Sequence, residues 1–377
     1  MPNHIKIVVI GAGFAGLSFC EALSNSNFNS FLLIEKKRSS LGGYASLGGI
    51  KVGLLPAGQR TADYFSKSDY DFYTHAFLRK YSNYLSTFNK SKTVLNLPDN
   101  VTNKYYKSFI IENKSIKNIL ASLTSKLSNK ILFSEVESIN RAYNESYSIL
   151  FSDGNQINCD TIVIASGRSE KIFFCLRKLN ESFNTTKDLI VGCRVTFEPE
   201  SAERIFSYQH DFKIKSETKM QTYCFNYRGN LNTYKYLNNL IYAGSFDIKS
   251  NIGNTFLGKK TKICYLDAIK LFPQAIIKKF DNLVSYLEQI NFANIKQDFL
   301  EFISIMCDSM NINLYQYYFP ALEQYWPSPI LKDNSLESMN IPNIYYIGDS
   351  SGVSYGFLQC YITACILSKK ILYNENY

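Results

Sequence analysis

A glycine-rich turn near the start of the chain constrains the fold more than any other feature. The apolar run Ile5 to Ile10 predicts a buried strand, and Gly11-Ala12-Gly13-Phe14-Ala15-Gly16 follows it directly. A helix is predicted over Ala15 to Ser24, and a second strand over Ser30 to Glu35 ends in an acidic residue. This order of elements opens a parallel sheet and has the spacing of a dinucleotide-binding turn.

Each glycine of this turn has its own physical role. Gly11 makes the tight turn, Gly13 lets a pyrophosphate approach the backbone, and Gly16 lets helix and strand pack closely. The helix N-terminus offers free N–H groups and a partial positive charge to the phosphates. Glu35 is placed to accept hydrogen bonds from the adenosine ribose hydroxyls. Its carboxylate would repel a 2′-phosphate, which argues against NADP in this site.

A second motif near the C-terminus favours FAD over NAD. It reads Tyr346-Ile347-Gly348-Asp349-Ser350-Ser351-Gly352 and includes a predicted strand, Ile344 to Ile347. FAD stretches across the sheet, so its ribityl chain needs a site at another strand end, where Asp349 can accept a hydroxyl hydrogen bond. A helix predicted over Gly356 to Leu372 would aim its N–H groups at the flavin pyrimidine edge. The alternative is an ordinary strand-to-helix turn with Asp349 as its cap.

Together with Ile162-Val163-Ile164-Ala165-Ser166-Gly167-Arg168, the two motifs resemble the three sequence marks of the FAD-dependent glutathione-reductase-like superfamily. The segments Val191–Val195, Asp211–Lys215 and Thr222–Phe225 are similar to a group of poorly characterised bacterial FAD-dependent dehydrogenases. The resemblance implies a β-meander between the halves of an FAD domain and a substrate domain over the flavin. We therefore expect an α/β fold: a Rossmann-type FAD-binding domain with a parallel sheet and a β-meander, plus a mixed-sheet α+β substrate domain.

The residues expected to bind FAD lie on the two motifs and on neighbouring strand ends. They are Gly11, Gly13, Ala15, Gly16, Glu35, Lys36, Gly42, Gly43, Val136, Ala165, Gly167, Gly348, Asp349, Gly356 and Phe357. No His or Cys lies in a flavin-attachment context, so the FAD is expected to be non-covalent.

The predicted elements divide the chain into two domains. Helices are expected within Thr61 to Asn89 and over Ser115 to Leu127. Residues Asp188 to Asp247 are strand-like, whereas Lys262 to Gln297 is mainly helical, which predicts a mixed sheet with helical cover. We assign residues 1–62, 112–175 and 335–377 to a discontinuous FAD domain, and residues 63–111 and 176–334 to the substrate domain.

Several departures from the superfamily narrow the chemistry. The disulfide reductases carry a Cys-x4-Cys after the second strand, whereas the loop Leu41 to Gly49 has no cysteine. Cys360 and Cys365 have that spacing but point away from each other on a helix. A second GxGxxG is missing, so NAD(P)H, if used, is a diffusible donor. The aromatic hydroxylases follow Gly-Asp with a small residue, His and Pro, and Ser350-Ser351-Gly352 makes hydroxylation less favoured.

The candidates for catalysis lie near the expected flavin. The loop Gly48 to Arg60 should run beside the pyrophosphate and flavin, so Lys51 could approach the isoalloxazine and Arg60 could bind phosphate or a substrate carboxylate. Tyr355, just before the last helix, could face the ring. Surface positions on a mobile loop are the alternative for both cations. Of the three histidines, His75 and His210 are the remaining candidates for a base, and neither is favoured.

Charge and composition argue against most macromolecular partners. The net charge is +9, but no basic run exceeds Lys36-Lys37-Arg38, so nucleic-acid binding is not favoured. The nine cysteines are scattered, without metal-ligand spacing, which favours reduced thiols in a cytoplasmic protein. No transmembrane segment is expected, and the oligomeric state is not predicted.

These observations favour FAD-dependent hydride transfer between a small organic substrate and flavin N5, without a redox-active disulfide. The alternatives are a flavin-dependent RNA-modifying enzyme, a monooxygenase, and a non-catalytic escort protein on the same fold.

Overall fold

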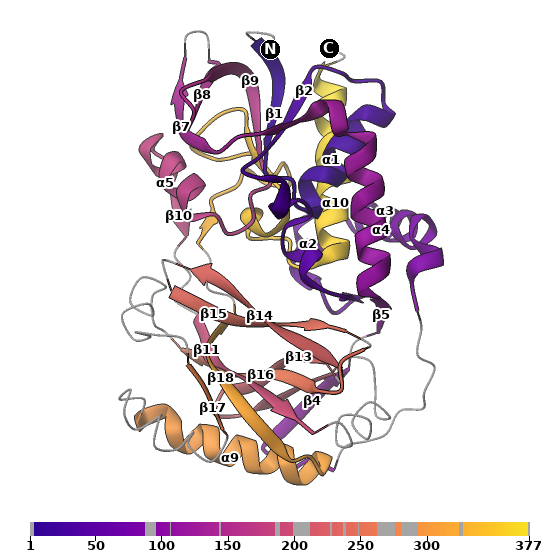
Figure 1. The fold of residues 1–377 in the computed structure, drawn as a ribbon, viewed down its shortest axis with the longest axis vertical. Coiled ribbons are helices and arrows are strands. Elements are labelled where there is room, and N and C mark those ends of the chain that lie inside the picture. Colours follow the sequence, from indigo (N-terminus) through magenta and orange to yellow (C-terminus); the bar gives the residue numbers. More distant parts are fainter. Residues whose placement is uncertain are drawn as a thin grey trace.

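The chain forms two layered units, one above the other in Figure 1. The computed structural model describes residues 4–86, 96–105, 107–142, 145–184, 189–198, 212–226, 228–236, 239–247, 249–261, 276–279, 293–323 and 327–375. The upper unit in Figure 1 combines N-terminal, central and C-terminal segments, and the lower unit is built mostly from the middle of the chain.

A seven-stranded sheet forms the centre of the first unit. Its strands are β1 (His4–Ile10), β2 (Phe31–Glu35), β6 (Ile131–Phe133), β7 (Val136–Arg141), β8 (Tyr147–Phe151), β9 (Gln156–Ile164) and β20 (Ile344–Tyr346). The order is β6–β2–β1–β9–β8–β7, and β20 also pairs with β9. β1 pairs in parallel with β2 and β9, as do β2 with β6 and β9 with β20, whereas β7 and β8 form an antiparallel meander. This arrangement is a Rossmann-type sheet with a β-meander.

Helices cover both faces of this sheet, which explains why the carboxyl halves of its central strands, residues 7–10 of β1 and 162–164 of β9, are apolar and buried. The helices are α1 (Phe14–Asn25), α2 (Gln59–Tyr64), α3 (Lys67–Lys80), α4 (Asn113–Lys126), α5 (Glu170–Lys178) and α10 (Phe357–Glu375). One core joins α1, α3, α4 and α10 to the sheet, and a second core joins α5 to the meander strands. The first residues of α1 and α10, Phe14 and Phe357, stack with their ring centroids 3.5 Å apart. The helices that follow the two glycine motifs therefore begin side by side.

The second unit is an antiparallel sheet with a helix on one side. The order of its strands is β17 (Ile276–Lys279), β18 (Leu314–Glu323), β11 (Leu189–Phe197), β16 (Gly253–Thr261), β13 (Met220–Asn226), β12 (Phe212–Ser216) and β4 (Val101–Tyr105). The hairpin β14 (Gly229–Tyr236) and β15 (Asn239–Phe246) lies above the sheet, and α9 (Ala293–Met310) lies below it in Figure 1. An ion pair between Lys259 of β16 and Asp298 fastens α9 to the sheet.

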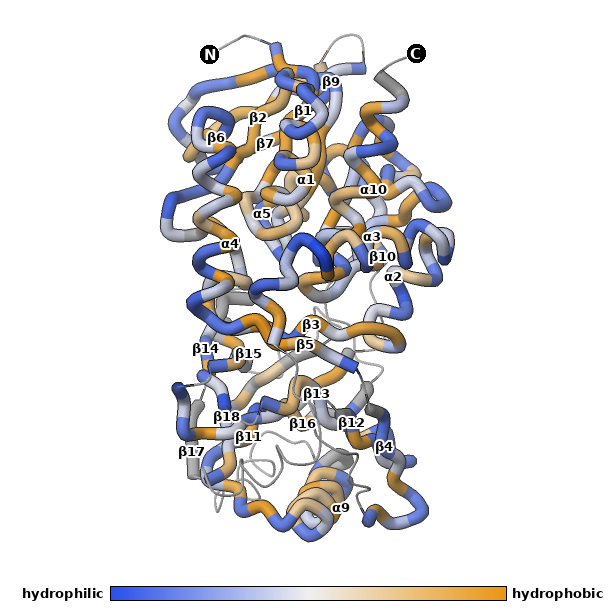
Figure 2. Tube along the Cα trace, turned by 90° about the vertical axis from the view of Figure 1, so that its right-hand side faces the viewer, coloured by the Kyte–Doolittle hydropathy of each residue, from blue (hydrophilic) through white to orange (hydrophobic). Residues whose placement is uncertain are grey.

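Two short strands lie where the units meet. β3 (Ile50–Gly53) pairs with β5 (Ser108–Ile111), and Figure 2 shows both at the level between the two units. Gly49, just before β3, exchanges two backbone hydrogen bonds of 2.7 and 3.1 Å with Phe246 at the end of β15. The loop after the first glycine motif is thereby bonded to the second unit.

The fold class predicted from the sequence is confirmed, with two differences in detail. We expected a mixed second sheet, but every strand pair described in it is antiparallel. Lys262 to Gln297 was expected to be mainly helical; of its described residues, 276–279 form the strand β17 and 293–297 belong to the helix α9. Pairing of Ile277 with Tyr318 on β18 overrides the local helical preference. Residues 262–275 and 280–292 lie outside the described part.

The helical stretch predicted over Thr61 to Asn89 is divided in two. Ser66 interrupts it, because its side chain accepts a hydrogen bond from the Asp69 N–H and caps α3. Phe77 of α3 is packed in the same core as α1 and α10, so this packing favours a domain boundary after α3 rather than at residue 62. Residues 87–89 lie outside the described ranges.

Candidate cofactor site

Two glycines of the first motif are required by the packing of the protein itself. Gly11 has a φ of +109°, and a Cβ there would lie 2.6 Å from the carbonyl oxygen of Ala165. A Cβ on Gly16 would overlap the carbonyl oxygen of Gly11. The turn is fixed by the Gly11 N–H, which donates to the Ile34 carbonyl at 2.8 Å. Gly11 and Gly16 therefore let β1, β9 and α1 approach one another.

The middle glycine is different. Gly13 has a φ of −69°, which any residue can adopt, and the nearest atom to a Cβ there would be the Ala165 oxygen at 4.0 Å. No side chain caps the N-terminus of α1. The protein's own packing therefore does not require glycine at this position, whereas close approach of a phosphate to these amides would.

A pocket of about 100 Å³ lies at the carboxyl ends of β1 and β2. It is lined by Ile10, Gly11, Ile34, Glu35, Lys36, Ser134, Glu135, Val136, Ser166, Ser169, Lys171 and Ile172. Four of the predicted cofactor residues meet here: Gly11, Glu35, Lys36 and Val136. Ligands of open α/β sheets bind at this end of the strands. This is the position that the adenosine end of a dinucleotide takes on a Rossmann-type sheet.

Backbone donors orient the acid in this pocket. Glu35 is only 8% exposed, and its two oxygens accept hydrogen bonds of 2.9 Å from the N–H groups of Ala12 and Lys36. The carboxylate is therefore held at the rim of the glycine turn, where its remaining lone pairs can accept from ribose hydroxyls.

Sequence reasoning missed the contribution of α5. Lys171 and Ile172 line the pocket from this helix, and the Lys171 ammonium lies 2.5 Å from Glu137 and 3.7 Å from Glu135. Its hydrogen bond with Glu137 raises the pKa of Lys171. These partners lie more than thirty positions apart in the sequence, so no local pattern could have identified them.

The second motif packs directly against the first. Gly348 has a φ of +63°, and a Cβ there would lie 2.9 Å from the Cβ of Ala15. The hydroxyl of Ser350 donates to the carbonyls of Ile164 and Ile347 at 2.9 and 2.8 Å, which fixes the turn on the ends of β9 and β20. Asp349 forms an ion pair with Arg168, whose Nε lies 3.3 Å from the carboxylate.

The loop after β2 packs against the first glycine motif. Gly42 donates its N–H to the Ala12 carbonyl at 2.8 Å, and a Cβ on Gly43 would lie 3.3 Å from the Gly13 Cα. Gly167 has a φ of +60° and open space around it, and Gly356 is exposed just before α10. The two motifs and the loop after β2 thus lie next to one another at the carboxyl ends of the parallel strands, and they carry most of the predicted cofactor residues.

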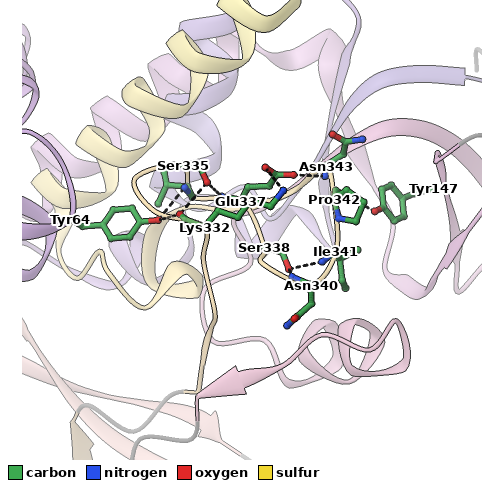
Figure 3. Close-up of polar contacts among 11 residues, drawn as sticks. Tyr64, Tyr147, Lys332, Ser335, Glu337, Ser338, Asn340, Ile341, Pro342 and Asn343 are labelled. Atoms are coloured by element: carbon green, nitrogen blue, oxygen red, sulfur yellow. Dashed lines mark hydrogen bonds and ion pairs between the residues drawn. The ribbon is translucent and has the colours of Figure 1, made fainter.

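The segment that leads into β20 is fastened on both sides (Figure 3). The Tyr64 hydroxyl donates to the Lys332 carbonyl at 2.9 Å, and the Tyr147 hydroxyl donates to the Pro342 carbonyl. Within the loop, Glu337 accepts a hydrogen bond from the Asn343 N–H at 3.0 Å. These contacts join α2 and β8 to this loop and so support the position of Gly348 and Asp349.

The two predicted catalytic residues, Lys51 and Tyr355, form hydrogen bonds with different parts of the protein. Lys51 of β3 donates a hydrogen bond to the carbonyl of Phe225 on β13, so its ammonium bridges the two units. Tyr355 accepts a hydrogen bond of 3.2 Å from Arg60 of α2. Burial raises the pKa of Tyr355, although the nearby Arg60 and Arg168 oppose the shift, so the phenol stays protonated at neutral pH. A catalytic role for Lys51 and Tyr355 stays a prediction.

Of the two histidine candidates, the one that the structure describes does not join this group. His75 is exposed on α3, and His210 lies outside the described residues. Within the described ranges, no three His, Cys, Asp or Glu residues are placed to hold a metal ion. None of the helices in the described part is long and apolar enough to cross a membrane.

The cysteines lead to a first prediction. None of the eight described cysteines forms a disulfide, and burial raises the pKa of Cys365 to about 11 and that of Cys193 to about 12. Among the described cysteines, only Cys224 is exposed. We expect a thiol reagent at neutral pH to label Cys224 first and to leave flavin binding and reduction unchanged, as mass spectrometry and absorbance would show. Stoichiometric inactivation at a substrate-protected cysteine would contradict this.

Comparison with known proteins supports the fold of the first unit. Residues 9–81 match the family model of the NAD(P)-binding Rossmann-like domain. This segment contains the first glycine motif, β2 and the loop after it. No curated protein gives a significant sequence match.

Solved structures extend the likeness to nearly the whole chain. A candidate FAD-containing monooxygenase from Photorhabdus luminescens subsp. laumondii TTO1 has a TM-score of 0.51 and 12% identity, over 99% of this chain and 89% of that chain. A salicylate hydroxylase in a substrate complex has a TM-score of 0.50 and 12% identity, over 100% of this chain and 81% of that chain. At this identity the likeness shows a shared fold.

Proposed function

We propose that the chain is an FAD-dependent oxidoreductase. The observation that carries the proposal is the contact between the two glycine motifs, in which Gly348 packs on Ala15 at the helix start that follows Gly13. The first motif alone does not distinguish NAD from FAD, whereas FAD needs a second strand end for its ribityl chain and flavin. The position of the pocket beside Glu35, at the ends of β1 and β2, supports the same cofactor. The narrower glutathione-reductase-like assignment stays a prediction.

The chain's own residues would divide the cofactor among them. Glu35 would accept hydrogen bonds from the ribose hydroxyls, and the amides after Gly13 would face the pyrophosphate. Asp349 would accept from the ribityl hydroxyls, with Arg168 orienting its carboxylate. The N-terminus of α10 would face the flavin pyrimidine edge and stabilise negative charge there.

Monooxygenation of a small organic substrate is the reaction class that we propose, in place of simple hydride transfer. Its support is the fold shared with a candidate FAD-containing monooxygenase and a salicylate hydroxylase over nearly the whole chain. Bound FAD would supply two electrons from diffusible NAD(P)H to molecular oxygen, so that one oxygen atom enters the substrate and the other leaves as water. The missing His-Pro after Gly348-Asp349 is a departure from the aromatic hydroxylases. Dehydrogenation is therefore the second candidate.

The second prediction tests cofactor and reaction class together. We expect the purified protein to carry one acid-releasable FAD per chain and to be reduced anaerobically by NADH or NADPH. In the presence of ¹⁸O₂ and a panel of aromatic carboxylates, we expect one ¹⁸O atom in the product, measured by mass spectrometry. Flavin reduced by a substrate without NAD(P)H would favour dehydrogenation, and a protein that binds no FAD would refute the proposed function.

A further inference from the structure

The Arg60 side chain is fixed in one place by residues from the other end of the chain. Its Nη1 donates to the Gly352 carbonyl at 3.0 Å and to the Tyr355 hydroxyl at 3.2 Å. The guanidinium carbon also lies 5.5 Å from the centroid of the Tyr355 ring. Three contacts through one nitrogen and one face restrict an otherwise flexible side chain.

The edge of this guanidinium that Nε and Nη2 form is open. Arg60 is an exposed residue, and within the part of the chain that the structure describes, neither its Nε nor its Nη2 has a hydrogen-bond partner in the protein. These two nitrogens form the edge that binds both oxygens of a carboxylate in parallel. The side chain is therefore held with its carboxylate-binding edge facing outward.

The surrounding charges favour a monoanion. Arg168, the second cation near Tyr355, is matched by Asp349 at 3.3 Å, whereas Arg60 has no acidic partner among the described residues. The Tyr355 phenol stays protonated and accepts from Arg60, so it keeps its own proton to donate to a ligand. One cation and one neutral donor suit a carboxylate better than a phosphate dianion.

We propose that Arg60 and Tyr355 form an anchoring site for the carboxylate of a small organic substrate. This inference rests on the proposed function, because it places the substrate beside the expected flavin. Tyr355 immediately precedes Gly356 and α10, so a carboxylate bound by Tyr355 would lie next to that position. It assigns a substrate class, an organic monocarboxylate, that the shared fold alone does not give. Arg60 binds both carboxylate oxygens through its Nε and Nη2, and Tyr355 donates a further hydrogen bond.

Isothermal titration calorimetry with benzoate, and with benzamide as its uncharged counterpart, tests this third prediction on the full-length chain with and without FAD. We expect benzoate to bind and benzamide not to bind. Arg60→Lys, which keeps the charge and loses the two-nitrogen edge, should weaken benzoate binding about tenfold. Tyr355→Phe should weaken it about threefold. Arg79→Lys, an exposed arginine on α3, is the matched control and should bind as the wild type does.

Three other outcomes would contradict the site, and a fourth would contradict only the proposed function. Equal benzoate binding by wild type and Arg60→Lys, with both proteins equally folded by circular dichroism, would remove Arg60 from it. Absence of benzoate binding to the wild type would overturn the proposal, as would binding of inorganic phosphate in preference to benzoate. If FAD fails to bind while benzoate binding still depends on Arg60, the proposed function is wrong and the anion site stands.

Discussion

Replacement of Gly13 by valine is expected to abolish FAD binding, with a dissociation constant raised at least about a hundredfold, while the protein remains folded. The backbone at Gly13 is extended, with φ −69° and ψ 175°, so valine fits it without strain. Apart from its neighbours in the chain, no protein atom would lie closer than 4.0 Å to its Cβ. The added methyl groups would occupy the space that the pyrophosphate needs. Flavin fluorescence titration measures the affinity, and thermal unfolding measures the fold.

Gly16→Val is the informative control for this experiment. Its Cβ would overlap the Gly11 carbonyl oxygen, so the helix and strand could no longer pack, and we expect loss of stability together with loss of FAD. The two variants should therefore separate a ligand-facing glycine from an architectural one. A Gly13→Val protein that retained its flavin would place the pyrophosphate elsewhere.

This contrast also shows what the sequence could and could not predict. The motif spacing was sufficient to predict the parallel sheet, because strand, turn and helix follow one another within thirty residues. The rule that ligands bind at the carboxyl ends of parallel strands was enough to predict Glu35 and Val136 as cofactor-binding residues. Both residues line the same pocket. The motif also predicted separate roles for Gly13 and Gly16, and the overlap of a Gly16 Cβ with the Gly11 carbonyl agrees with the packing role of Gly16.

Contacts between distant segments account for most of what the sequence did not predict. Arg60 and Tyr355 were separate candidates, and their contact joins residues 295 positions apart. Lys51 finds its acceptor on β13, 174 positions away. The strand β17 likewise depends on its pairing with β18 rather than on its own four residues. Local patterns carry no information on such pairs, because their partners are chosen by the tertiary fold.

One buried carboxylate links α1, α3 and α4. The Glu21 side chain, 5% exposed, forms ion pairs with Lys80 and with Lys126, the latter at 2.8 Å. Burial by itself raises the pKa of Glu21, but the hydrogen bonds from Lys126 and Lys80, together with their charges, outweigh it and hold the pKa below its ordinary value. The carboxylate therefore stays charged in the folded state and links three helices of one core.

We expect Glu21→Gln to lower the free energy of unfolding by about 2 kcal/mol at neutral pH, measured by urea denaturation. Removal of one partner from a buried pair costs about 3–5 kcal/mol, and the exposure of both lysines, 32% and 57%, reduces that cost. Glu137→Gln is the matched control, because Glu137 also pairs with a lysine but is exposed, and we expect no measurable change there.

The pH dependence separates the charge of Glu21 from its packing. The pKa of Glu21 in the folded state lies below its unfolded value near 4.5. The charged carboxylate therefore stabilises the fold above pH 4.5, and this stabilisation is lost as the pH falls through the folded-state pKa. The difference between wild type and Glu21→Gln should thus be constant near neutral pH and should shrink below about pH 4.5. A difference that stays the same down to acid pH would show that shape and hydrogen bonding, rather than charge, hold the three helices together.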